Sequence, residues 1–133
     1  DYCFATKFAS AKLSELAIGI GPFVVGPAVE RKIGTSAFSA MTINATKWFD
    51  AEWAREKGLY TEIFDSAEQM DIEVAKLATT LSNSNPEAME GLKKVMWQGT
   101  DHWDTLLMER ALSSGTLVLS DFTRNAIAKF KKT

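Results

Sequence analysis

The stretch DYCFATKFASAKLSELAIGIGP, residues 1–22, decides the fold of this chain. Residues 2–6 are apolar, compact and rich in aromatic side chains, which predicts a short buried β-strand. Both faces of that strand are hydrophobic, as in a strand that lies inside a larger sheet. Residues 8–13 alternate loosely and predict a second strand or an extended loop. Because a few short strands cannot satisfy their own edges, we expect the other strands of the sheet to lie in sequence outside this chain.

The rest of the chain predicts mostly helix, interrupted by one strand over residues 59–64. Pro27 suits the first turn of a helix, and Gly34 suits the left-handed cap that ends it. Asp50 predicts an N-cap, and Ser66 begins a capping box. We expect helices over residues 27–33, 37–43, 51–57, 66–82, from 86 onward, 102–119 and from 120 or 121 to 132.

Two of these predicted helices carry apolar side chains at helical spacing. The first has its stripe at Met70, Val74, Leu77, Ala78 and Leu81. In the second, which Asn85 caps, we expect a buried face of Met89, Leu92, Val95 and Met96.

Composition excludes several classes of protein. The 133 residues carry 15 basic and 17 acidic side chains, so the basic excess of a nucleic-acid-binding domain is absent. A single cysteine, Cys3, cannot form an internal disulfide, and no run approaches the ~18 apolar residues of a membrane span. We therefore expect a cytoplasmic protein that binds neither nucleic acid nor membrane. We also expect it to need no metal ion or cofactor.

Glu15 is the acidic residue that stands apart. It lies among Leu13, Leu16, Ile18 and Ile20, just before glycines at positions 19, 21 and 26. Partial desolvation in such a segment suits a general acid or base near neutral pH. From these residues alone a second interpretation stays open, in which Glu15 is a surface side chain at the end of a strand.

The same stretch resembles the central segment of the enoyl-CoA hydratase/isomerase (crotonase-type) family. There, an acidic residue that opens a strand is followed by a segment similar to Phe-x-x-Pro-Glu-x-x-x-Gly-x-x-Pro. Here Ser14 replaces the first proline, while Glu15, Gly19 and Pro22 keep their places. The stretch WFDAEWAREKGL at residues 48–59 and the Ser-Asn-Pro at residues 84–86 also resemble the family.

This resemblance covers essentially the whole chain but only about half of a typical family member. It implies an α/β crotonase-like fold of which this chain is the C-terminal half, a few short strands followed by a mostly α-helical region. Residues 1–64 would belong to the core, and residues 65–133 would form a helical oligomerisation region. The implied partners are the missing N-terminal half and further copies of the protein in a homotrimer or hexamer.

The resemblance also implies a site. Glu15 would be one of two catalytic carboxylates; the other, together with the oxyanion hole, would lie upstream of Asp1. Phe23 and Val24 stand where the family has a glycine-rich run, and we expect them either to narrow the acyl pocket or to pack in the core. Three residues near the end, Lys129, Phe130 and Lys132, would meet coenzyme A, or would simply balance charge and pack at a helix end.

The function that the resemblance implies is hydration of a 2-enoyl-CoA thioester, with Glu15 protonating the α-carbon. One alternative is an enoyl-CoA isomerase in which Glu15 shuttles the proton alone. Another is a non-catalytic helical assembly module. Because the oxyanion hole contributes orders of magnitude in rate, we expect this chain to be nearly inactive by itself.

Overall fold

The computed structural model describes residues 1–130 of the chain, except for the side chain of residue 130. In chain order, the elements are β1 (Phe4–Thr6), β2 (Ser10–Ala11), the 3-10 helix η1 (Glu15–Ile18), α1 (Gly26–Ile43), β3 (Phe49–Asp50), α2 (Ala51–Glu56), β4 (Glu62–Phe64), α3 (Ala67–Ser82), α4 (Pro86–Met96), α5 (Trp103–Val118) and α6 (Asp121–Phe130).

The strands form two small sheets within the described residues. Strand β1 pairs with β4 in parallel, and β2 pairs with β3 in antiparallel orientation. A parallel pair needs a long crossover between its strands, and α1 and α2 lie in that connection. The two strands predicted at residues 2–6 and 59–64 are present but shorter, at residues 4–6 and 62–64. The predicted strand or loop at residues 8–13 contains the two-residue β2.

The buried core lies between α1 and the second sheet. Leu13, Ile33, Ala37, Met41 and Phe49 form one hydrophobic cluster. Helix α1 contains a kink at Gly34, whose φ of 77° and ψ of 160° are not helical. The two helices predicted over residues 27–33 and 37–43 are thus two runs of one element. They meet at the glycine that was expected to end the first of them.

The capping predictions are confirmed at three helices. The Asp50 carboxylate accepts a hydrogen bond of 2.9 Å from the Trp53 N–H at the start of α2. The Ser66 hydroxyl oxygen accepts from the Gln69 N–H at 3.3 Å, and the Asn85 side chain accepts from the Glu87 N–H at 2.9 Å. These bonds satisfy N–H groups that would otherwise lack partners, so local sequence sets the helix starts.

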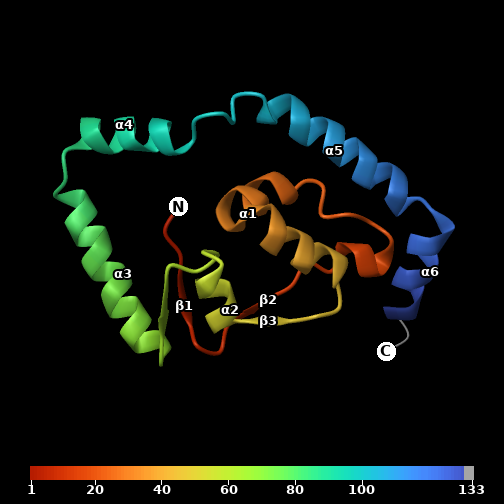
Figure 1. Cartoon of the computed structure of the whole chain (residues 1–133), viewed down its shortest axis with the longest axis horizontal. Helices are drawn as coiled ribbons and strands as arrows, with labels where there is room; N and C mark the ends of the chain where they lie inside the picture. The colour runs from red at the N-terminus through yellow and green to blue at the C-terminus, as the bar shows by residue number, and fades with distance from the viewer. Residues whose placement is uncertain (131–133) are drawn as a thin grey trace.

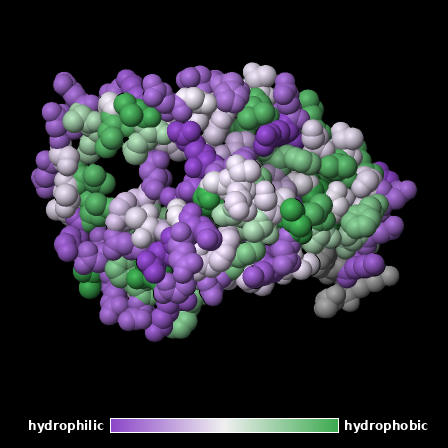
Figure 2. Space-filling model, viewed as in Figure 1, coloured by the Kyte–Doolittle hydropathy of each residue, from purple (hydrophilic) through white to green (hydrophobic). Residues whose placement is uncertain are grey.

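Helices α3, α4, α5 and α6 form an arm that curves around this core (Figure 1). Helix α3 packs against β1 and β4, and α6 packs against η1. The space-filling view shows an opening between the arm and the core on the side of α3 and α4 (Figure 2). No helix in the part of the chain that the structure describes is long and apolar enough to cross a membrane.

The predicted burial of the apolar face of α4 is wrong. The exposed fractions of Met89, Leu92, Val95 and Met96 are 38%, 58%, 64% and 42%. Helical periodicity predicts which side of a helix is apolar, but burial also requires a partner surface opposite that side. No described element of this chain covers the face.

Candidate active site

Glu15 is the first residue of η1 and is half-buried. The short helix ends at Gly19, whose φ of +85° is a left-handed conformation that favours glycine. The Gly19 N–H donates to the Leu16 carbonyl at 3.1 Å, and the Ile20 N–H donates to the Glu15 carbonyl at 2.9 Å. The glycine-punctuated turn expected from the sequence is therefore a closed 3-10 turn, which fixes the backbone of Glu15.

The Glu15 side chain borders an open cleft of about 430 Å³, which we call the Glu15 cleft. The walls of this cleft are largely hydrocarbon. Its other lining residues are Ile20, Gly21, Pro22, Phe23, Val24, Val25 and Ser114. The Oε2 atom of Glu15 is buried and accepts no hydrogen bond from any residue in the described range. Most buried polar atoms are paired, and an unpaired carboxylate oxygen costs folding free energy, so this atom calls for a functional explanation.

Helix α6 supports the Glu15 turn from behind. A Cβ atom on Gly19 would lie 2.4 Å from Cδ1 of Phe122 and 2.8 Å from Oγ1 of Thr123. Thr123 is fully buried, and its N–H donates to the Ser120 hydroxyl oxygen at 3.3 Å. The end of the chain therefore packs directly against the segment that carries the carboxylate.

Phe23 and Val24 both lie in the Glu15 cleft. The Phe23 ring lies over Gly21, where a Cβ atom would come within 2.5 Å of the ring. The Phe23 N–H donates to the Gly21 carbonyl at 2.8 Å, and Arg110 on α5 donates to the Phe23 carbonyl at 3.4 Å. Phe23 is 36% exposed and Val24 is 46% exposed, so neither side chain is part of the buried core.

The structure does not place Lys129 in this cleft. Lys129 lies exposed in the last turn of α6 and is not among the lining residues. Lys132 and the side chain of Phe130 lie outside the described residues, so their proposed contact with coenzyme A stays a prediction.

Sequence reasoning missed Ser114. This residue comes from α5, far along the chain from the Glu15 turn, and it is the polar side chain that shares the cleft with Glu15. A serine in a helix that contains several hydroxyl residues has no sequence signal that distinguishes it. Only the docking of α5 beside the turn reveals it.

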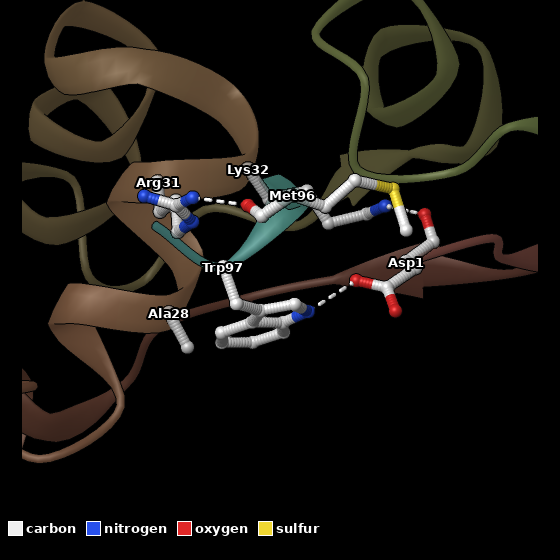
Figure 3. A pocket seen from close by; sticks show the side chains of 6 residues that line it. All are labelled: Asp1, Ala28, Arg31, Lys32, Met96 and Trp97. Carbon is white, nitrogen blue, oxygen red and sulfur yellow. Dashed lines mark hydrogen bonds between the residues drawn. The ribbon is translucent and has the colours of Figure 1, made fainter. Parts of the chain in front are cut away.

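A second cleft, of about 380 Å³, lies between α1 and the end of α4 (Figure 3). Here the Trp97 indole N–H donates to the Asp1 carboxylate at 2.8 Å, and Lys93 pairs with the other oxygen of that carboxylate. Lys32 donates to the Asp1 carbonyl at 2.9 Å, and Arg31 donates to the Met96 carbonyl. Because these polar groups are paired with one another by hydrogen bonds and an ion pair, we interpret the cluster as a structural contact that joins α4 to the core.

No group of three or more metal-binding side chains occurs in the part of the chain that the structure describes. The Glu15 cleft offers one carboxylate and one hydroxyl, which is fewer ligands than a metal site needs. A carboxyl group in such apolar surroundings is suited to proton transfer.

Comparison with known proteins decides the family. The sequence model of the enoyl-CoA hydratase/isomerase family matches residues 1–127. The chain belongs to this family. No curated protein sequence matches the chain.

Solved structures of enoyl-CoA hydratase/isomerases have a similar fold. An enoyl-CoA hydratase/isomerase from Pseudoalteromonas atlantica T6c superimposes with a TM-score of 0.88 at 17% identity, over 99% of this chain and 53% of that one. An enoyl-CoA hydratase from Mycobacterium avium subsp. paratuberculosis K-10 gives a TM-score of 0.86 at 22% identity, over 99% of this chain and 54% of that one. The chain therefore has a crotonase-like fold and spans about half the length of these structures.

Proposed function

We propose that this chain supplies the proton-transferring carboxylate of an enoyl-CoA hydratase. In this proposal Glu15 protonates the carbon next to the thioester carbonyl of a 2-enoyl-CoA, while the oxygen of water bonds to the next carbon along. One observation carries the proposal: Glu15 borders an apolar cleft, and one oxygen of its carboxylate is buried without a hydrogen-bond partner among the described residues.

The chemistry of the proton acceptor explains that arrangement. A carbon atom is a poor hydrogen-bonding partner, so a carboxyl group that serves it has no polar group opposite its reacting oxygen. Hydrocarbon walls exclude water and thereby strengthen electrostatic interactions during the transfer. Ile20, Val24 and Val25 provide such walls here. A solvated structural carboxylate would instead face water or a basic side chain.

The remaining catalytic groups come, in this proposal, from the missing N-terminal half of the same protein. By family resemblance, the second carboxylate and the N–H donors that polarise the thioester carbonyl belong to a segment upstream of Asp1. We therefore expect the 133 residues alone to be nearly inactive. The coenzyme A thioester is the substrate, and no further cofactor is required.

An isomerase is the second candidate. Among the described residues that line the cleft, Glu15 is the only acid. A single carboxylate can remove a proton from one carbon of an enoyl thioester and return it to another, which moves the double bond without adding water. Hydration needs a second group to activate water, so the two activities separate in the assay described below.

The acyl end of the substrate would meet Phe23 and Val24. Because the Phe23 ring is held over Gly21, it forms a wall of the cleft and favours short or branched acyl groups. At the other end of the substrate, Lys129 and Lys132 would approach the phosphates of coenzyme A and Phe130 its adenine.

The uncovered apolar surface of the arm supports the proposed assembly. The exposed side chains of Leu92, Val95, Met108 and Leu112 lie on α4 and α5 without a covering element in the described chain. Further copies of the protein, in a trimer or hexamer, would bury them. Analytical ultracentrifugation of the purified protein measures this directly.

The activity test uses the gene product that carries these residues, whatever its length. Loss of the conjugated thioester absorbance of crotonyl-CoA measures hydration, and conversion of a 3-enoyl-CoA to its 2-enoyl isomer measures isomerisation. Glu15→Gln should lower kcat of the active reaction by about 10²- to 10⁴-fold, as expected for loss of a general acid. The matched control is Glu56→Gln, because Glu56 is exposed at the end of α2 and should leave the rate unchanged.

A further inference from the structure

Ser114 differs from the other hydroxyl residues of α5. The hydroxyl of Ser113 donates to the Glu109 carbonyl at 3.2 Å, and that of Thr116 donates to the Leu112 carbonyl at 3.0 Å. This return to the carbonyl four residues earlier is the usual way in which a helical hydroxyl is satisfied. The side chain of Ser114 is half-buried and lines the Glu15 cleft, and its hydroxyl makes no hydrogen bond with any residue from 1 to 130.

The cleft is therefore lined by two residues whose polar side chains contain a group without a hydrogen-bond partner among the described residues. Oε2 of Glu15 can accept a hydrogen bond, and the hydroxyl of Ser114 can both donate and accept. They come from elements at opposite ends of the sequence, η1 and α5, and the rest of the lining contributes apolar surface. A purely hydrocarbon ligand would leave both groups buried and unpaired, which costs binding free energy.

A ligand hydroxyl matches the hydrogen-bonding chemistry of both groups. Its O–H can donate to the Glu15 carboxylate while its oxygen accepts from Ser114. A ligand carboxylate or phosphate in the same place would instead be repelled by the Glu15 charge. The chemistry of the pair therefore selects a neutral group that both donates and accepts.

We propose that Ser114 is a specificity-determining residue that hydrogen-bonds the hydroxyl group which hydration places on the acyl chain. The cleft then binds a 3-hydroxyacyl thioester in preference to the saturated thioester of the same length. This inference rests on the proposed function, since it requires an acyl-CoA in the Glu15 cleft. Ser114 itself exchanges no proton with carbon; it positions the oxygen.

The experiment is a pair of binding measurements on the gene product. Isothermal titration calorimetry gives Kd for 3-hydroxybutyryl-CoA and for butyryl-CoA, and the ratio of the two Kd values isolates the hydroxyl. Ser114→Ala should reduce the preference for the hydroxy compound about five-fold, the effect of one ordinary hydrogen bond. Ser114→Thr keeps a hydroxyl and should retain most of the preference. Ser113→Ala, the matched control on the same helix, should leave the ratio at the wild-type value.

The possible results distinguish a failure of the proposed role of Ser114 from a failure of the proposed function. A ratio that Ser114→Ala leaves unchanged, with both thioesters still bound, overturns the role of Ser114 and leaves the proposed function standing. Equal losses in Ser114→Ala and Ser113→Ala also overturn it, because they indicate a general effect on α5. Absence of binding of either thioester to the wild-type protein contradicts the proposed function itself, and the inference with it.

Discussion

Replacing Gly19 with alanine tests whether α6 holds the Glu15 turn in place. Two costs are expected from the structure. The φ of +85° is a conformation that alanine adopts at a cost of about 1–2 kcal/mol. The added Cβ atom would also lie 2.8 Å from Oγ1 of Thr123, which is fully buried and has no room to retreat. Overpacking of this kind costs about 1–3 kcal/mol.

Gly99 provides the matched control. Its φ is +83°, but a Cβ atom there would meet nothing within 4 Å. Gly99→Ala therefore carries only the conformational cost, about 1–2 kcal/mol, whereas Gly19→Ala should lower the free energy of unfolding by about 2–5 kcal/mol. Urea denaturation followed by far-ultraviolet circular dichroism of the gene product measures both variants.

The difference between the two variants is the informative quantity. It reports the contact between α6 and the Glu15 turn, because the backbone cost is common to both glycines. We expect Gly19→Ala to lose catalytic rate as well, through displacement of the carboxylate. Equal destabilisation by the two substitutions would refute the reasoning, since it would mean that α6 is not packed on Gly19.

Two further predictions concern acyl length and pH. Phe23→Ala should widen the Glu15 cleft and raise kcat/KM for longer acyl-CoA substrates relative to crotonyl-CoA, by up to about four-fold per added methylene. The control is Phe8→Ala, because the Phe8 side chain is 77% exposed and does not line the cleft. An unchanged length preference in Phe23→Ala would contradict the proposal that Phe23 limits the acyl length. Burial, with a smaller contribution from Cys3, raises the pKa of the Tyr60 phenol above its usual 10.0. Because the folded-state pKa lies above the unfolded value, this contribution to stability is full below the unfolded pKa and is lost as the pH rises through the folded pKa. The free energy of unfolding, measured with urea from about pH 9 to about pH 11, should therefore decline, and Tyr60→Phe should reduce that decline. A decline of equal size in the variant would contradict this assignment.

The sequence predicts local structure well where one residue determines it. Asp50, Ser66 and Asn85 each begin a helix as expected, because an N-cap needs only its own side chain and the next three residues. Gly34 likewise breaks α1 through its own positive φ. Such features depend on interactions within a single turn, and these can be predicted from neighbouring residues in the sequence.

Features that depend on distant packing are harder to predict. The apolar face of α4 was recognised as a face, but its burial depends on a surface that no described element supplies. Leu13 was expected beside Glu15, yet it is part of the core cluster, whereas Ser114 from α5 shares the cleft. Glu15 was selected because its segment resembles a known family, and its catalytic role stays a prediction. Ser114 could not be selected, because a helical serine has no distinguishing neighbours in sequence.

The most direct measurement follows one hydrogen atom. If Glu15 delivers a proton to the carbon beside the thioester carbonyl, turnover of crotonyl-CoA in heavy water by the gene product should place deuterium on that carbon, detectable by nuclear magnetic resonance. Glu15→Gln should abolish this incorporation while crotonyl-CoA still binds, and Glu56→Gln should not affect it. Incorporation at the wild-type rate in Glu15→Gln would show that another group transfers the proton and that the Glu15 cleft is not the site of the chemistry.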